Sequence, residues 1–163
     1  MAEAASASSL SLVSSDGRTF NVPSDVIARR GDGVCAGYHS ATVNDLLLDD
    51  MIIGESIPLS NVAGETFEKV LEFCRRRHGL EAGETDEEWE RRYLQIDQAA
   101  LFKLVSAADY LDIKDLLDVT CMQVARLIRG KTAEELRTLF NIKNDFTPEE
   151  ETEIRNENAW LFD

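Results

Sequence analysis

The chain has 163 residues and a formal net charge of −14, with 44% hydrophobic residues and only 9 glycines and 3 prolines. This length and composition predict one folded domain with short disordered pieces, which can bury about 70% of its unfolded surface without a metal or disulfide. The negative charge excludes partners that are held through their phosphates, so we expect no nucleic-acid binding and no docking on anionic membranes.

The negative charge is concentrated in two segments. Residues 79–96 carry 2 basic and 6 acidic residues, and residues 144–163 carry 1 and 7, whereas residues 97–143 carry 7 of each. Residues 79–92 also lack an apolar period, so we expect an acidic flexible linker there.

The first half of the chain shows only short patterns of secondary structure. Asp-Gly at 16–17 lies between two alternating runs and predicts a β-hairpin, and Pro23 with Ser24 predicts the start of a short helix. The expected segments, in chain order, are a disordered tail at 1–9, the hairpin at 9–22, a loop at 31–40, a helix at 42–48, a strand at 52–59 and a helix at 65–77.

The second half is predicted to be helical from Asp97 onwards, because apolar residues recur with the 3.6-residue period of an amphipathic helix. Asp112 is expected to cap a second, longer helix that ends at Gly130. Two capping boxes, Thr132 to Glu135 and Thr147 to Glu150, predict the starts of two further helices.

The residue types that carry catalysis or bind metals are not clustered in the sequence. Cys35, Cys74 and Cys121 form no CxxC pair, and His39 and His78 lack ligand partners at helical spacing. We therefore expect free thiols, no metal, no cofactor and no catalytic residue. No stretch approaches about 18 apolar residues and no signal segment is recognised, so we expect a cytoplasmic and nuclear protein.

The second half also carries a specific set of motifs: Ala107-Ala-Asp-Tyr-Leu-Asp-Ile-Lys114, Leu116-Leu-Asp-Val-Thr-Cys121, Ile128-Arg-Gly-Lys-Thr132, Phe140-Asn-Ile-Lys-Asn-Asp-Phe-Thr-Pro-Glu-Glu-Glu151 and Arg155-Asn-Glu-Asn158. Together they resemble the Skp adaptor family, whose members join F-box proteins to a cullin in SCF ubiquitin ligases. The resemblance runs nearly continuously over residues 94–160 and more loosely over 10–27 and 57–74.

The resemblance implies an α/β protein with a BTB/POZ fold and two additional C-terminal helices. The BTB/POZ-type domain would span residues 10–129 and the helical extension residues 130–163. The implied function is that of an adaptor, not an enzyme, with F-box proteins and a cullin as partners.

The resemblance also implies which residues meet the F-box protein. They lie on the long second helix and in the extension: Leu116, Cys121, Val124, Leu127, Ile142, Asn144, Phe146 and Trp160. Leu117 and Ile128 are expected in the core instead. Pro148 matches a proline that is hydroxylated and glycosylated in some protist members, although a plain proline at the first helical position is the favoured interpretation.

The cullin-facing residues implied by the resemblance are Val43, Leu47, Asp109 and Tyr110. The family usually has asparagine where this chain has Asp109, which adds a negative charge and removes an amide donor. The glycine-rich stretch at 31–39 resembles an insertion of about eight residues beside the same surface.

Three other functions stay open at this point. A protein that binds F-box partners in a cullin-independent complex would fit Asp109 and the insertion. A BTB module of the elongin-C or channel-tetramerisation kind fits less well, because such modules lack the capped helices after Thr132, and an enzyme is the least favoured. Exposed apolar residues in the extension also predict a weak homodimer of the chain when it is free of F-box protein.

Overall fold

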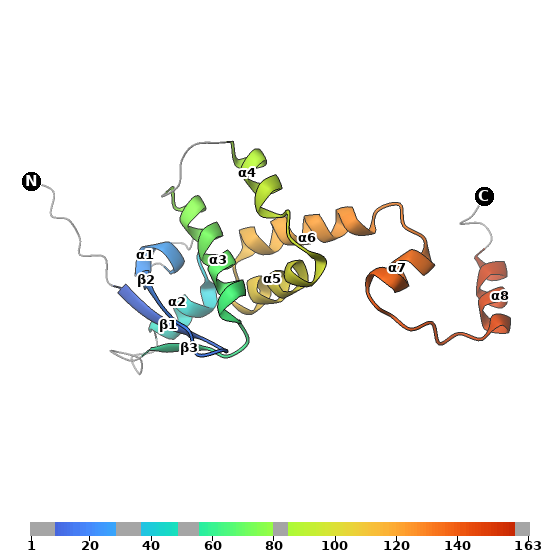
Figure 1. Cartoon of the computed structure of the whole chain (residues 1–163), viewed down its shortest axis with the longest axis horizontal. Coiled ribbons are helices and arrows are strands. Elements are labelled where there is room, and N and C mark those ends of the chain that lie inside the picture. The colour runs from blue at the N-terminus through green and yellow to red at the C-terminus, as the bar shows by residue number, and fades with distance from the viewer. Residues whose placement is uncertain (1–8, 29–36, 49–55, 80–84, 159–163) are drawn as a thin grey trace, which may run out of the picture. The chain divides into compact units, whose positions relative to one another are not determined.

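The computed structural model describes residues 9–28, 37–48, 56–79 and 85–158 (Figure 1). The chain divides into two compact units, Met1–Arg126 and Leu127–Asp163. The first unit combines a three-stranded sheet with helices, which confirms the predicted mixed α/β class.

The helices and strands follow the predicted order with one addition. In chain order they are β1 (Ser9–Ser14), β2 (Thr19–Pro23), α1 (Ser24–Ile27), α2 (Ala41–Leu48), β3 (Ile57–Leu59), α3 (Gly64–Arg77), α4 (Asp86–Tyr93), α5 (Gln98–Tyr110), α6 (Lys114–Ile128), α7 (Ala133–Leu139) and α8 (Pro148–Glu157).

The predicted hairpin is confirmed as the pair β1 and β2. Gly17 has φ +80°, and its N–H donates to the Ser14 carbonyl at 2.9 Å. The Ser14 N–H in turn donates to the Arg18 carbonyl at 2.9 Å. A glycine closes this turn because left-handed backbone is unfavourable for other residues. β1 also pairs in parallel with β3, so the strand order is β2-β1-β3.

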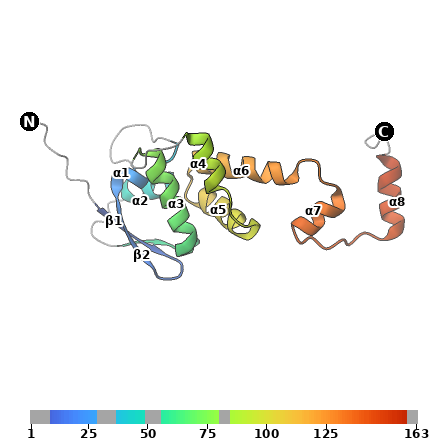
Figure 2. The ribbon, with the colours of Figure 1, turned by 45° about the horizontal axis from the view of Figure 1, so that its top comes forward.

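The core of the first unit lies between the sheet and α3. Alternate residues of β1 point inwards, and Leu12 is completely buried. The apolar face of α3 supplies Phe67 and Phe73, which are also fully buried. α3 packs against both α1 and α5. Figures 1 and 2 show the hairpin on one side of α3 and α5 on the other.

Part of the predicted linker at 79–92 is a helix, so that prediction is wrong from residue 86 onwards. Thr85 and Glu88 form a capping box that begins α4, with the Glu88 N–H donating to Thr85 Oγ1 at 3.4 Å. Trp89 and Tyr93 are buried, and their rings stack with centroids 4.7 Å apart. α4 buries only these two aromatic residues, which lie one turn apart. Its sequence therefore lacks an extended apolar period that would indicate an amphipathic helix.

α4 is fastened to α3 by polar contacts as well as by the aromatic rings. The Tyr93 hydroxyl donates to the Lys69 carbonyl at 2.8 Å. Arg77 pairs with Asp86 at 3.4 Å and also with Glu90. Burial raises the pKa of the Tyr93 phenol above its ordinary value, so this group stays protonated and can keep donating.

Some predicted segments lie partly outside the described residues. Ser9 begins β1, and the remainder of the predicted tail at 1–9 is not described. Only residues 37–40 of the predicted loop at 31–40 are described, and only residues 56–59 of the predicted strand at 52–59.

The second unit is built almost entirely by local interactions. Both predicted capping boxes are present, so α7 begins after Thr132 and α8 begins after Thr147 as expected. The Thr147 backbone N–H donates to Glu150 at 2.8 Å, which lowers the pKa of that carboxyl. Within α7 and α8, all of whose residues are described, none is buried.

Replacing Trp89 should destabilise the first unit strongly. The Trp89→Ala change removes a large buried ring that stacks on Tyr93, so we expect the free energy of unfolding to fall by about 3–5 kcal/mol. Urea denaturation followed by circular dichroism would measure it. The exposed neighbour Glu87→Ala should change it by less than about 1 kcal/mol, and equal effects of both changes would contradict the docking of α4.

Candidate functional site

The first candidate surface lies where the end of α5 meets the start of α2. Ser40 Oγ donates to the Leu111 carbonyl at 2.6 Å, and Thr42 Oγ1 donates to the Tyr110 carbonyl at 2.9 Å. The Ala41 N–H donates to the Asp112 carbonyl at 3.3 Å. The negative end of the α5 dipole therefore faces the positive end of α2, which is the favourable arrangement.

This junction brings together the two segments that carry the predicted cullin-facing residues. Asp109 is exposed, and Tyr110 and Leu47 are half-buried, so all three are accessible at the surface. Val43, in contrast, has no exposed area and belongs to the core. Its position one turn into α2 holds the helix in place, so its side chain is not available to a partner.

A tight turn joins α5 to α6. The Asp112 N–H donates to the Asp109 carbonyl and the Ile113 N–H to the Ala108 carbonyl, both at 3.0 Å. These two bonds form a Schellman motif, with Asp112 at φ +48° in the position where glycine is usual. The predicted role of Asp112 as the N-cap of the next helix is wrong, because α6 begins only at Lys114.

The predicted insertion at 31–39 is described only from residue 37. The Gly37 carbonyl accepts a hydrogen bond from the Asp115 N–H at 2.9 Å, which ties this segment to the first turn of α6. The Tyr38 hydroxyl lies 3.3 Å from His78 Nδ1, and His39 Nε2 lies 3.0 Å from the Asp25 carbonyl. Each histidine therefore makes a contact between segments that are separated in the sequence.

On α6 the predicted F-box residues separate into core and surface. Leu116 has no exposed area and belongs to the core, while its neighbour Leu117 is only half-buried. Cys121 is exposed, and Val124 and Leu127 are half-buried. Ile128 is 37% exposed, so the prediction that it lies in the core is wrong.

The assignments of Leu116 and Ile128 failed for a physical reason. α6 is apolar over a wide arc, and the 3.6-residue period cannot tell which edge of that arc faces inwards. Met122 on the same helix was not among the predicted surface residues, although it is 58% exposed. The signal that could have found Met122 is its place three residues after Val119, at the edge of the face of α6 that buries Leu116, Val119 and Thr120.

The second unit presents Phe146 on a connected set of polar contacts. Asn144 donates to Glu151 at 2.6 Å, and the Phe146 N–H donates back to Asn144 Oδ1 at 3.3 Å. The Arg137 guanidinium lies 5.8 Å from the centre of the Phe146 ring and 3.8 Å from Glu151. Phe146 is nevertheless 46% exposed. The predicted residues Asn144 and Phe146 are thus held together, with the ring open to solvent.

Ile142 is placed by the end of α7. Its N–H donates to the Arg137 carbonyl at 2.8 Å, and the Asn141 N–H donates to the Thr138 carbonyl at 3.3 Å. With Asn141 at φ +54°, this is a second Schellman motif, and it leaves Ile142 exposed. Pro148 is exposed at the first position of α8, and Trp160 lies outside the described residues.

The described residues hold no group of three histidine, cysteine or carboxylate side chains that could bind a metal ion. Cys74 is buried in α3, and burial raises the pKa of its thiol to about 12. A thiol with this pKa is protonated at neutral pH and is therefore a poor nucleophile. None of the helices in the described segments is long and apolar enough to span a membrane.

Cys74 should resist alkylation in the folded protein. Its raised thiol pKa lowers the fraction of reactive thiolate, and its burial keeps the reagent away, whereas Cys121 is exposed. Treatment with iodoacetamide at mildly alkaline pH, followed by peptide mass spectrometry, should label Cys121 and leave Cys74 unmodified until denaturant is added. Equal labelling of both cysteines under native conditions would contradict the packing around α3.

Asp112 should be replaceable by glycine but not by alanine. The left-handed backbone costs a residue with a Cβ about 1 kcal/mol, so Asp112→Gly should raise the free energy of unfolding by roughly 0.5–1 kcal/mol. Asp112→Ala should lower it by a similar amount, because alanine lacks the short polar side chain that makes left-handed backbone more tolerable for aspartate. Urea denaturation would measure both values. Asp118→Ala on the exposed face of α6 is the control, and equal stability of the two Asp112 variants would exclude this turn geometry.

Comparison with known proteins places the chain in one family. The Skp1 family tetramerisation domain matches residues 8–79, and the Skp1 family dimerisation domain matches residues 114–161. SKP1-like protein 1A of Arabidopsis thaliana is 42% identical over 170 residues, which cover 97% of this chain and 99% of that protein.

Two further relatives come from other organisms. The SCF ubiquitin ligase complex protein SKP1a of Dictyostelium discoideum is 43% identical, over 93% of this chain and 94% of its own length. The E3 ubiquitin ligase complex SCF subunit sconC of Arthroderma otae is 41% identical, over 98% of both chains. The predicted family and its POZ-type fold are thereby confirmed, and the chain belongs to the Skp1 family.

Proposed function

We propose that this chain is a non-catalytic adaptor subunit of an SCF-type E3 ubiquitin ligase and bridges F-box substrate receptors to a cullin. The observation that carries the proposal is similarity over nearly the whole chain to proteins named as subunits of SCF ubiquitin ligase complexes. An adaptor needs binding surfaces and no reacting groups, which agrees with a buried, protonated Cys74.

The cullin would bind at the junction of α2 and α5. Tyr110 combines an apolar ring with a hydroxyl, and such residues contribute strongly to interfaces. Leu47 adds apolar area, and Asp109 adds a charge that requires a donor or cation from the partner. Val43 supports this surface from the core.

The F-box protein would bind along α6 and the second unit. We assign Cys121, Val124 and Leu127 on α6, and Ile142, Asn144 and Phe146 after α7, to this contact, because each has accessible surface. Trp160 stays a prediction from the sequence. Leu116 is left out of the contact because its side chain is completely buried.

A cullin-independent complex with F-box proteins is the second candidate. Asp109 favours it, because this exposed carboxylate lies at the carbonyl end of α5, where negative charge already accumulates. A cullin surface without a matching cation would be repelled at this position.

The division into two surfaces predicts separable losses of binding. In affinity purification with quantitative mass spectrometry, Tyr110→Ala should reduce recovered cullin by about tenfold or more and leave F-box proteins unchanged. Phe146→Ala and Trp160→Ala should instead reduce F-box proteins. Ser106→Ala on α5 and Glu153→Ala on α8 are exposed controls that should change neither.

Each result of this purification decides between the functions. Recovery of F-box proteins without cullin by the unmodified chain would support the cullin-independent complex. Recovery of neither partner would overturn both candidates. Full F-box binding by both Phe146→Ala and Trp160→Ala would overturn the assignment of the second unit.

Two smaller expectations accompany the proposal. The free thiol of Cys121 is exposed, which suits the reducing conditions of the cytoplasm and nucleus. Exposed Ile142, Phe146 and Ile154 would favour a weak homodimer when no F-box protein covers them.

A further inference from the structure

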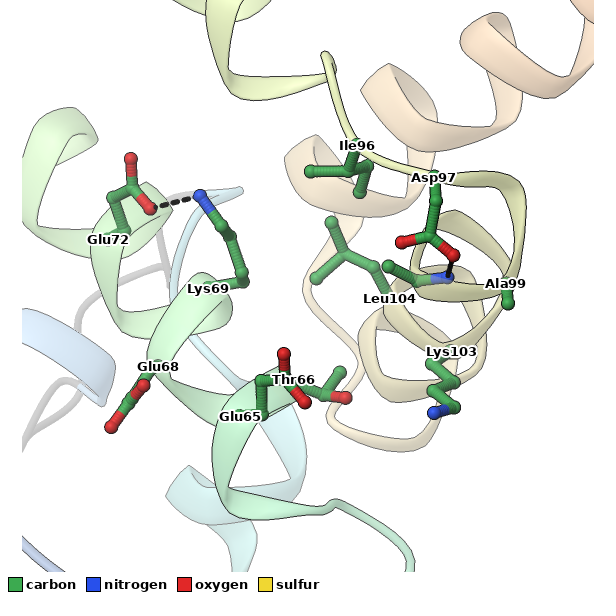
Figure 3. Close-up of a pocket in the computed structure, with 11 residues that line it drawn as sticks. Glu65, Thr66, Glu68, Lys69, Glu72, Ile96, Asp97, Ala99, Lys103 and Leu104 are labelled. Carbon is green, nitrogen blue, oxygen red and sulfur yellow. Dashed lines mark hydrogen bonds and ion pairs between the residues drawn. The ribbon is translucent and has the colours of Figure 1, made fainter.

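A cleft of about 620 Å³ lies in the first unit between α3 and α5 (Figure 3). None of the residues that line it is assigned to either proposed surface. α3 forms one wall, α5 forms the other, and the turn before α5 contributes Ile96 and Asp97. The two walls differ in chemistry, and this difference indicates what the cleft can bind.

The α5 side of the cleft is mostly apolar with small side chains, and its one cation, Lys103, is exposed. Leu104 is almost fully buried, and Ile96 and Ala100 are half-buried, so together they make an apolar floor. Ala99 is exposed at the edge. Because two alanines lie where larger residues could stand, the cleft has room for one large apolar side chain from a partner.

The α3 side of the cleft carries a row of carboxylates. Glu65, Glu68 and Glu72 have the i, i+3, i+7 spacing that places residues along one face of a helix. Figure 3 shows Glu65 on the α3 wall and Leu104 on the opposite wall. The lining contains four carboxylates and two lysines, so its charge attracts a cationic partner.

The ion pairs already present on this wall can be exchanged. Glu72 pairs with Lys69 at 2.7 Å, and Glu68 pairs with Arg18, but all four side chains are at least 37% exposed. Exposed pairs of this kind contribute about 0–1 kcal/mol, so a partner's lysine or arginine can replace them at little cost. Asp97 keeps its own role, because it caps α5 by accepting from the Ala100 N–H at 3.3 Å.

We propose that this cleft binds a basic amphipathic segment of a partner protein. One apolar side chain of the segment lies against Ile96, Ala100 and Leu104, and its lysines or arginines lie along Glu65 and Glu72. Ala99 and Tyr110 are 11 residues apart on α5, which is about 16 Å. A segment in the cleft therefore leaves the α2–α5 junction accessible, and this binding is additional to the adaptor function.

The test must separate this binding from general attraction to a chain with charge −14. The probe is a fluorescein-labelled synthetic peptide with leucine and lysine at helical spacing. The control peptide has the same sequence with serine in place of each leucine. Fluorescence anisotropy should show at least about tenfold tighter binding of the leucine peptide. In NMR titration the amide signals of Thr66, Ile96 and Ala100 should shift.

Two pairs of variants test the location of binding. Ala99→Trp fills the cleft from an exposed position and should weaken binding of the leucine peptide by about tenfold or more. Ser106→Trp, elsewhere on α5, should leave this binding unchanged. Glu65→Lys with Glu72→Lys should also weaken it, whereas Glu149→Lys with Glu153→Lys makes the same charge change on α8 and should preserve most binding. The second pair keeps the test valid if a tryptophan variant fails to fold.

Equal binding of the leucine and serine peptides would overturn the proposal, because it would leave only charge attraction. Equal weakening by Ala99→Trp and Ser106→Trp, or by the two lysine pairs, would overturn the location. Neither result depends on cullin or F-box binding, so failure here is distinguishable from failure of the proposed function.

Discussion

The end-to-end contact between α5 and α2 is the constraint on which the first unit depends. Ser40 is completely buried, so its hydroxyl must have hydrogen-bond partners; it donates to the Leu111 carbonyl and accepts from the Val43 N–H at 3.1 Å. One side chain thus satisfies a carbonyl at the end of α5 and an amide at the start of α2. This contact fixes where Leu47, Asp109 and Tyr110 lie relative to one another, although α2 and α5 are far apart in the sequence.

The second unit obtains its shape in a different way. α7 and α8 bury no side chain, so their order depends on two capping boxes, the turn at Asn141 and the contacts of Asn144 with Glu151 and Phe146. Isolated helices this short are marginal in water. Exposed apolar residues on such helices are stabilised when a partner covers them. This is the physical reason that α7 and α8 are better suited to binding a partner than to forming a core.

The sequence predicted the parts of the fold that depend on local signals. The Asp16-Gly17 turn, the capping boxes and the apolar stripes on α3, α5 and α6 each specify their own conformation, and the structure confirms them. The prediction missed α4, although Thr85 to Glu88 carries the same capping-box pattern, because the two aromatic residues that follow in an acidic segment become informative only when Phe73 and the α3 arginines are brought beside them.

The candidate surfaces were predictable only as segments. Which side chains of those segments face outwards depends on tertiary packing: Val43 and Leu116 turn inwards because α2 and α6 each press one edge of their apolar arc into the core. The accessible sides of Tyr110 and Phe146 followed from family motifs and not from any period in the sequence. The cleft between α3 and α5 had no sequence signal, since its lining combines residues from two helices and a turn.

The placement of charge follows from the same division between packed and unpacked helices. α5 and α6 lie in the balanced part of the sequence and are held by buried apolar side chains, so they need little help from charges. α8 has no such support. Its Glu149, Glu150 and Glu151 lie in the first turn, where negative charge interacts favourably with the positive end of the helix dipole. The acidity of residues 144–163 therefore also helps to stabilise a helix that has no buried core.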